Sequence, residues 1–523
     1  MKLTRRDSLK LFAAATPSFA LRPARAFAAD LPIAAGPFQG TRSSLAGYKI
    51  PSWFGEAKFG IWSHWGPQSA IEDGDWYARN MYVQGSDQYK YHLKTYGHPS
   101  KVGYKDLVPQ FKAARWDPDH LMDLYVKAGA KYFFSMGVHH DNYDMWNSKY
   151  QKRWNAVATG PNKDIVGIWK NAARKRGLRF GVSEHLSNSY DWFATSHTSD
   201  STGPLAGVPY DGVLPAYADL YHDYTGEPAD FVKTAKAMGR VAPTRWKQEY
   251  FNRIKDLLDQ HQPDLLYTDG GIPFEEYGLS LVAHLYNLSA KKHGGKVESI
   301  YFSKTMTDCE NGTCALDRER GVLDDIAANP WQTDTCVGEW HYRRGVKYKS
   351  AKKVIDLLVD IVSKNGNLLL NFPLPNSGEL DPEEVTTLEG ITAWMQINSE
   401  GIYASRPWKI YGEGPSTKVV IAKNGKEFDP NEGKKPDLGA QDIRFTTKGK
   451  TLYAFVQGWP AGEAVVTSLG TGSPHAQKVV GAHMLGYSES LKFTQRADGL
   501  HVTMPSTRPA SADIGIALKL TVA

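Results

Sequence analysis

A single carboxylate stands at the end of a short apolar run in the middle of the chain. Residues 265–268 read Leu-Leu-Tyr-Thr, and Asp269 follows them directly, before two consecutive glycines. An apolar run of this length predicts a buried strand, and Gly-Gly is a turn signal. Asp269 is therefore expected at the carboxyl end of a strand, where it could take part in catalysis or could simply cap the turn.

Imidazoles occupy corresponding positions after other apolar runs. They are His64, His139, His140 and His185. Catalytic residues of α/β barrels gather at the carboxyl ends of the strands, so this recurrence favours a site at that rim. A histidine satisfied by backbone groups in the core is the simpler alternative for each of them, but a pair directly after a strand favours ligand binding.

Strand-like runs alternate with amphipathic helices over residues 58–366. The expected strands are 58–62, 132–138, 178–182, 265–268, 299–302 and 366–372. The expected helices are 117–127, 164–176, 244–260 and 351–363. This alternation predicts a parallel sheet, and the number of units favours an α/β fold of the (β/α)8-like barrel type. A doubly wound sheet would be favoured by a Gly-rich phosphate loop after the first strand, which the sequence lacks.

The pattern changes after Trp408 to short strands separated by Gly, Pro and Asn. The candidates are 419–422, 442–446, 451–456, 464–468, 478–480, 500–504 and 516–520. Short strands without helices predict a C-terminal antiparallel β-sandwich domain. We therefore expect three parts, which are an export signal (1–29), the barrel (30–408) and the sandwich (409–523).

The N-terminus resembles a Tat export signal. The pair Arg5-Arg6 precedes a weak apolar stretch (11–21) and an Ala-Phe-Ala site at 26–28. Two prolines in this region disfavour the alternative, an amphipathic helix that belongs to the fold. Cleavage just after this site would give a periplasmic or secreted protein.

The charge distribution bears on possible partners. The chain carries +6, and the segment 1–29 holds six basic residues against one acidic residue, or +5, which leaves about +1 for the rest. A nucleic-acid partner is therefore not expected. No later stretch is long and apolar enough to span a bilayer, so no membrane partner is expected either.

The aromatic content suits a sugar ligand. Aromatic residues make up 12% of the chain, with 15 Trp and 27 Tyr, although such rings also fill cores. Hydrolysis of a glycosidic bond needs two carboxyl groups, and Asp269 is the candidate for the first. From the residues alone, the second stays open among Glu184, Glu310, Glu319 and Glu339.

The three cysteines are Cys309, Cys314 and Cys336. Export would permit a disulfide, and Cys309 and Cys314 bracket a plausible turn, but three free thiols are equally compatible with the sequence. The cysteine spacing does not match a structural metal site, and no His-x-x-x-His pattern indicates one. We expect no metal and no cofactor.

Six blocks of sequence occur in a family-specific order along the chain. They are 53–66, 75–81, 139–161, 265–271, 330–333 and 365–371. In these blocks and in the C-terminal sandwich the chain resembles the α-L-fucosidases of glycoside hydrolase family 29. The resemblance implies an exo-acting enzyme that releases terminal α-L-fucose from fucosylated oligosaccharides or polysaccharides. It also implies net retention through a covalent glycosyl-aspartate intermediate.

The resemblance assigns roles to individual residues. It implies that Asp269 is the nucleophile and that sugar hydroxyls are bound by His64, Asp75, Trp76, His139 and His140. Tyr267 stands where the family often has Trp. His185 lies in a loop where members often carry Tyr, and Lys304 lies near the place of an Arg that holds the sugar.

The acid/base residue is the variable part of this family. Measured back from the block at 330–333, it is expected within 317–321, where Glu319 is our choice and Asp317, Glu310 and Glu339 are the alternatives. Arg318 and Arg320 flank Glu319 and would oppose its protonation if they pointed at it. They should therefore point elsewhere, unless the cleft is dry enough to compensate.

Three other functions stay open from the sequence. An α-L-galactosidase would differ only in accepting a hydroxymethyl group at C5. The chain could also be a carbohydrate-binding protein without activity, or a metal-dependent hydrolase that uses His139, His140 and Asp269. The insertion 188–224 could cover the cleft or pair with a neighbouring subunit, so a homo-oligomer is possible. The glycosidic linkage and the tolerance of sulfated glycans are not indicated.

Overall fold

The computed structural model describes residues 31–224, 242–418 and 437–523. The expected export signal and the expected strand 419–422 lie outside these ranges. Within them, no helix has the length and apolar character needed to cross a membrane.

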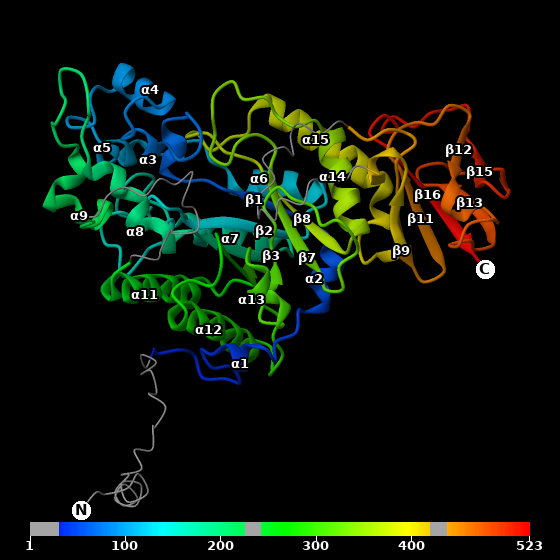
Figure 1. The fold of residues 1–523 in the computed structure, drawn as a ribbon, viewed down its shortest axis with the longest axis horizontal. Helices are drawn as coiled ribbons and strands as arrows, with labels where there is room; N and C mark the ends of the chain where they lie inside the picture. Colours follow the sequence, from blue (N-terminus) through cyan, green and yellow to red (C-terminus); the bar gives the residue numbers. More distant parts are fainter. Residues whose placement is uncertain (1–30, 225–241, 419–436) are drawn as a thin grey trace, which may run out of the picture. The chain divides into compact units, whose positions relative to one another are not determined.

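Eight parallel strands form the central sheet, and several of them are labelled in Figure 1. They are β1 (Phe59–Ser63), β2 (Tyr132–Val138), β3 (Arg179–Glu184), β4 (Leu265–Thr268), β5 (Ile300–Ser303), β6 (Ala315–Leu316), β7 (Trp331–Cys336) and β8 (Gly366–Asn371). Their order is β6-β5-β4-β3-β2-β1-β8-β7. A parallel bridge between Asp317 and Gln332 joins β6 to β7, so the sheet closes on itself. The predicted (β/α)8-like barrel is confirmed.

Among the described residues, six long helices surround or follow these strands. They are α6 (Pro118–Lys127), α7 (Ile165–Lys175), α11 (Thr244–His261), α12 (Glu276–Lys292), α14 (Ala351–Ser363) and α15 (Pro382–Asn398). Side chains cap the first turns of three of them, from Asp117, Asp164 and Ser350. Shorter helices lie in the connections: α1 (Arg42–Leu45), α2 (Ser52–Ala57), α3 (Tyr77–Asn80), α4 (Asp87–Thr95), α5 (Tyr104–Leu107), α8 (Ser189–Trp192), α9 (Ala218–Tyr221) and α13 (Met306–Glu310).

The insertion 188–224 is anchored to the segment that carries α3 to α5. The carboxylate of Asp200 accepts a hydrogen bond from Tyr89 (2.7 Å), and that of Asp211 accepts one from Tyr82 (2.7 Å). Both aspartates are buried. Buried carboxylates are stable only when they are hydrogen-bonded, so these two pairs hold the insertion against the segment of α3 to α5.

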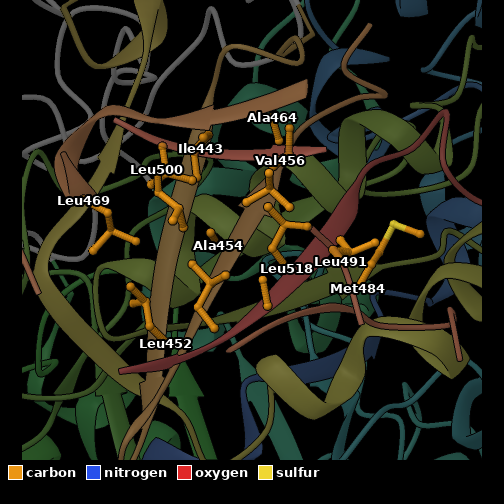
Figure 2. Packing of buried hydrophobic residues seen from close by; sticks show 14 of the residues in the cluster. Ile443, Leu452, Ala454, Val456, Ala464, Leu469, Met484, Leu491, Leu500 and Leu518 are labelled. Atoms are coloured by element: carbon orange, nitrogen blue, oxygen red, sulfur yellow. The ribbon is translucent and has the colours of Figure 1, made fainter. Parts of the chain in front are cut away.

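Eight antiparallel strands form the C-terminal region over residues 406–418 and 437–523. They are β9 (Arg406–Glu413), β10 (Ile443–Lys448), β11 (Thr451–Val456), β12 (Glu463–Val466), β13 (Val479–Met484), β14 (Phe493–Gln495), β15 (Leu500–Thr503) and β16 (Ile516–Val522). One sheet has the order β13-β16-β11-β10-β9 and the other the order β12-β15-β14. Figure 2 shows the shared apolar core, to which Leu452, Leu500 and Leu518 belong. The predicted antiparallel domain is confirmed, and its expected start at residue 409 falls inside β9.

The C-terminal sheets contact the last helices of the barrel. The Trp394 indole of α15 donates a hydrogen bond to the carbonyl of Gly515 (2.9 Å). In α14, Asp360 pairs with Arg444 of β10 and with Lys364 (3.0 Å). These contacts join the two domains through buried polar groups as well as apolar packing.

Candidate active site

Asp269 follows β4 directly and faces three donors from neighbouring strand ends. Its Oδ1 lies 2.6 Å from Lys304 Nζ. Its Oδ2 lies 3.3 Å from His140 Nε2 and 3.3 Å from His185 Nδ1. Burial alone would raise the pKa of Asp269, but Lys304, His185 and His140 hold it well below its usual range. Asp269 is therefore an ionised carboxylate at neutral pH, as a nucleophile must be.

Lys304 follows β5 and joins two carboxylates. Its Nζ is 2.6 Å from Asp269 Oδ1 and 2.6 Å from Glu319 Oε2. Burial would lower the pKa of Lys304, but the two carboxylates raise it well above its usual range. Because Asp269 Oδ1 and Glu319 Oε2 contact the same nitrogen, the distance between these two oxygens is at most twice 2.6 Å.

Glu319 reaches this centre from the connection between β6 and β7. Its second oxygen, Oε1, accepts a hydrogen bond from Trp340 Nε1 (3.1 Å). Arg320 lies over the Trp340 ring, 5.3 Å from its centroid, and its Nη2 reaches Cys336 Sγ (3.2 Å). Arg318 packs against Gly321.

The alternative carboxylates have other surroundings. Glu184 is fully buried and accepts hydrogen bonds from Tyr250 (2.9 Å), Thr268 (2.6 Å) and a backbone N–H, while burial raises its pKa to about 7. Glu339 pairs with Arg343 (3.2 Å).

The other two candidates for the acid are also placed differently from Glu319. Asp317 lies in the barrel interior beside Gln332, and Glu310 ends α13. Glu319 is the one of these carboxylates that shares Lys304 with Asp269.

An imidazole cluster lies beside the carboxylate pair. The ring of His64 lies 4.5 Å from that of His341 and 5.0 Å from that of His139. Asp75 Oδ1 accepts a hydrogen bond from His341 Nδ1 (2.5 Å), and His139 Nδ1 bonds to Gln68 Nε2 (3.0 Å). Burial, followed by neighbouring imidazoles, lowers the pKa of His64 and of His139 well below the usual range. Both rings are therefore neutral at neutral pH and can each donate and accept one hydrogen bond.

Aromatic rings line the other side of His140. Trp76 lies 6.1 Å from the His140 ring and 6.1 Å from the ring of Trp192, which comes from the insertion. Trp76 has a φ of 62°, in the left-handed region that a bulky side chain rarely adopts. Backbone strain of this kind clusters at ligand sites, because the surrounding structure must enforce it.

Tyr267 points its hydroxyl into the barrel rather than along the rim. The hydroxyl donates to Asp334 Oδ2 (3.0 Å), and Lys304 Nζ lies 5.5 Å from the ring centroid. The Tyr267 ring therefore makes a cation–π contact with the ammonium group of Lys304. A direct contact of Tyr267 with a sugar stays a prediction.

The structure thus brings all ten predicted site residues into one region and adds three that the sequence did not reveal. These are Trp192, Trp340 and His341. Trp340 and His341 follow β7, so the rule that located the other imidazoles would have found them if β7 had been recognised. Trp192 lies in the insertion, where no periodic signal indicates its position.

Some of these side chains could also hold a metal ion. The ligand atoms of two groups lie within 4.8 Å of one another. The groups are His64, Asp75, His139 and His341, and His139, His140 and His185. Neutral imidazoles and a carboxylate are ligands for transition metals, but the same donors and acceptors suit the hydroxyls of a sugar. The aromatic walls and the paired carboxylates beside them favour the sugar.

Comparison with known proteins gives a consistent result. The Alpha-L-fucosidase family model matches residues 26–400, and the Alpha-L-fucosidase C-terminal domain model matches residues 436–521. The tissue alpha-L-fucosidase of Rattus norvegicus is 28% identical over 490 residues, which cover 91% of each chain. That of Homo sapiens is 26% identical over 490 residues, which cover 91% of this chain and 90% of the human one.

Solved structures agree in fold. The alpha-fucosidase of Thermotoga maritima in complex with fucose has a TM-score of 0.71 and 24% identity, and the alignment covers 92% of this chain and 100% of that chain. An alpha-L-fucosidase GH29 from Bacteroides thetaiotaomicron has a TM-score of 0.62 and 19% identity, with 94% and 98% covered. At these identities the similarity shows the shared architecture alone.

Proposed function

The chain belongs to the α-L-fucosidases of glycoside hydrolase family 29, and from this premise we propose that it releases terminal α-L-fucose with net retention through a covalent intermediate on Asp269. Its activity is that of an α-L-fucosidase, so its substrates are fucosylated glycans. The observation that supports the mechanism best is the shared contact of Lys304 with Asp269 and Glu319. It holds one oxygen of each carboxylate no more than twice 2.6 Å apart, a limit that is compatible with the separation of about 5–5.5 Å in retaining glycosidases.

In the first step Asp269 attacks C1 of the fucosyl group, and the bond from C1 to the glycosidic oxygen breaks. Glu319 gives its proton to the departing oxygen. In the second step Glu319 takes a proton from water while the water oxygen attacks C1 and the ester bond to Asp269 breaks. Two inversions give net retention, and both carboxyl groups return to their starting protonation states.

The geometry sets one condition on the first step. Glu319 has to give a proton to the departing oxygen when the glycoside is bound, whereas its Oε2 contacts Lys304 Nζ (2.6 Å) in the free enzyme. We infer that Lys304 leaves Glu319 when the sugar occupies the space between the carboxylates and keeps its bond to Asp269. Lys304 would then stabilise the negative charge of the nucleophile until the ester forms.

The surrounding side chains fit the groups of a deoxy sugar. The neutral rings of His64 and His139, with Asp75 and His341, offer donors and acceptors for hydroxyls. The wall of Trp76 and Trp192 offers an apolar face. Comparing aryl α-L-fucoside with aryl α-L-galactoside as substrates would test whether this region also accepts the C5 hydroxymethyl group of L-galactose.

Substitution of the two carboxylates tests the mechanism. We expect Asp269→Ala to lower kcat by at least about 10⁴-fold while the protein stays folded, because the nucleophile is lost. Glu319→Ala should keep turnover of substrates with good leaving groups and should regain activity with azide, which gives an α-fucosyl azide if retention holds. Glu339→Ala is the matched control.

The assay separates the alternatives. Near-normal activity of Asp269→Ala would refute the proposal, and rescue of Glu339→Ala or Glu310→Ala by azide would reassign the acid. Loss of activity in EDTA that zinc restores would favour a metal-dependent hydrolase.

We also propose that the chain is exported by the Tat route, processed near residue 29 and active in the periplasm or outside the cell. The twin arginines and the Cys309–Cys314 disulfide support this proposal, because stable disulfides are typical of oxidising compartments. Sequencing the N-terminus of the exported protein tests the cleavage site. Retention of an Arg5→Lys, Arg6→Lys variant in the cytoplasm would support the route, and normal export of that variant would contradict it.

A further inference from the structure

Helix α13 (Met306–Glu310) lies between Lys304 and Glu319 along the chain and carries a buried carboxylate that the mechanism does not use. We propose that this residue, Asp308, is a positioning residue that holds the loop of Asp269 and the segment of Lys304 in their reactive places. The inference rests on the roles proposed above for Asp269 and Lys304.

Both oxygens of Asp308 are occupied by donors from three separate segments. Oδ2 accepts hydrogen bonds from the backbone N–H of Ile272 (2.9 Å) and from the hydroxyl of Ser303 (2.9 Å). Oδ1 accepts one from Arg42 Nη1 (2.8 Å). Ile272 lies three residues after Asp269, and Ser303 immediately precedes Lys304. One side chain of α13 therefore ties both site residues to the same point.

The two tied segments also contact each other directly. The backbone N–H of Lys304 donates to the carbonyl of Gly270 (2.9 Å). Gly271 approaches α13 so closely that a Cβ atom there would lie 2.7 Å from Thr305 Oγ1 and 3.2 Å from Asp308 Oδ2. The glycine is needed because the loop packs against this helix without room for a side chain. A shift of Asp308 would therefore move the backbone on both sides of the catalytic ion pair.

A disulfide links the same helix to the segment of Glu319. Cys309, the next residue after Asp308, is bonded to Cys314, which immediately precedes β6 (Ala315–Leu316). Glu319 lies five residues after Cys314, in the connection that follows β6. Thus α13 is held by hydrogen bonds on the side of Asp269 and by a covalent bond on the side of Glu319.

The chemistry of the contact predicts what an amide would do. In Asp308→Asn, one carboxylate oxygen becomes an NH₂ group, which would face an N–H, an O–H or a guanidinium instead of accepting from it. Two donors that face each other repel, so the loop that follows Asp269 would have to move to separate them. A misplacement of about 1 Å far from the reacting atoms can cost about 10²-fold in rate. Within the part of the chain that the structure describes, His64, His139 and His341 make no hydrogen bond to Asp308, so sugar affinity should change less.

Asp264 provides a matched control at the other end of the same strand. It precedes β4, is also buried, accepts from the backbone N–H of Phe180 (3.0 Å) and faces Arg179 Nη1 (3.5 Å). Asp264→Asn thus removes a similar carboxylate with similar partners but acts at the end of β4 that is remote from Asp269.

The experiment compares kcat, KM and the inhibition constant of L-fucose for the full-length Asp308→Asn and Asp264→Asn variants at a temperature where both are folded. We expect kcat of Asp308→Asn to fall at least about fivefold more than that of Asp264→Asn, with the inhibition constant within about threefold of the wild type. A smaller difference in kcat, or an equal loss in both variants, would overturn the proposal.

Two additions keep the result interpretable. If Asp308→Asn does not fold, Ser303→Ala replaces it, because it removes one donor to Asp308 beside Lys304. The same fivefold criterion against Asp264→Asn then applies. Asp269→Ala is measured in parallel. Activity in that variant would refute the nucleophile assignment itself, whereas the comparison of Asp308 with Asp264 tests the positioning role.

Discussion

At the scale of single residues, the site depends on the charge of Lys304. Its ammonium group contacts both carboxylates and is almost fully buried. Two carboxylates this close would repel each other without an intervening cation, and one of them would take up a proton. Lys304 therefore keeps Asp269 ionised when the substrate arrives, because it lowers the pKa of that carboxyl.

Removal of this cation should change the pH dependence of the reaction as well as its rate. Lys304 lowers the pKa of Asp269, so Lys304→Met should let that pKa rise and should move the acidic limb of kcat/KM to higher pH. We also expect kcat/KM to fall about 100-fold or more at the optimum, as for the loss of one group that stabilises charge in an active site. A pH–rate profile with an aryl fucoside measures both effects.

The control variant is Lys304→Arg, which keeps the charge. Its acidic limb should stay near that of the wild type even if its rate is lower. An unchanged acidic limb in Lys304→Met would show that Lys304 does not control the ionisation of Asp269.

The sequence predicted the reactive side chains better than the side chains that surround them. Asp269 and the four imidazoles follow apolar runs, so the strand-end rule located them. The rule could not locate Trp340 and His341, because β7 reads Trp-Gln-Thr-Asp-Thr-Cys and lacks an apolar pattern. Its Gln332 and Asp334 point polar groups into the barrel, where Tyr132 and Tyr267 bond them.

At the scale of elements, the strands with continuous apolar runs were predicted closely. The expected strand 132–138 matches β2, and the expected helix 351–363 matches α14. The two-residue strand β6 and the helix α13 have no periodic signal because they are too short to show one. These unpredicted elements carry the connection between Lys304 and Glu319, so the sequence alone could not show how the two are held together.

The disulfide on α13 gives a prediction at this scale. The sequence left open whether Cys309 and Cys314 pair, and the structure shows that they do. Replacing both by Ser should lower the stability by about 2 kcal/mol, as expected for a short closed loop, and should lower the melting temperature by a few degrees. Thermal unfolding with and without reductant measures the change.

The double variant also serves as its own control. Reductant should lower the melting temperature of the wild type and should have no further effect on the variant. A wild-type protein that is insensitive to reductant, under conditions where thiol titration shows three free cysteines, would contradict a stabilising role of this bond.

At the scale of the whole molecule, an ion-pair group joins the barrel to the C-terminal domain. Asp360 bonds Arg444 and Lys364, and Arg444 also donates to Ser416 (2.9 Å). Burial would raise the pKa of Asp360, but Lys364 and Arg444 hold it below its usual value. The two domains therefore share a charge network that neither could satisfy alone.

Arg444→Met should destabilise the protein by about 3 kcal/mol, because it leaves a carboxylate with one cation fewer at a buried interface. The pKa of Asp360 is depressed on folding, so its stabilisation is present above the unfolded value of about 3.9 and is lost as the pH falls through the folded value. The difference in melting temperature between variant and wild type should therefore shrink on acidification. A difference that is independent of pH would exclude this linkage, and kcat of the folded variant should stay unchanged.

The amino-terminal end of strand β1 carries a buried lysine without a hydrogen-bond partner among the described residues. Lys58 caps α2 immediately before β1 and is fully buried, and its Nζ has no hydrogen-bond partner among the described residues. Burial, with a smaller contribution from Arg406, lowers its pKa to about 7. A lysine in this position is neutral in the folded protein above that pH but is charged in the unfolded chain, so folding is penalised.

Lys58→Met should therefore stabilise the enzyme in a pH-dependent way. The unfolded lysine binds a proton below about pH 10.5, whereas the folded one binds it only below about pH 7, so the wild type gains stability as the pH rises through this window. The gain in the free energy of unfolding of Lys58→Met over the wild type is largest below about pH 7, on the order of 5 kcal/mol. This gain falls toward zero at high pH. Thermal unfolding across this range measures it, with the exposed Lys49→Met as control. A constant benefit at all pH values would mean that Lys58 remains charged in the fold and acts through packing alone.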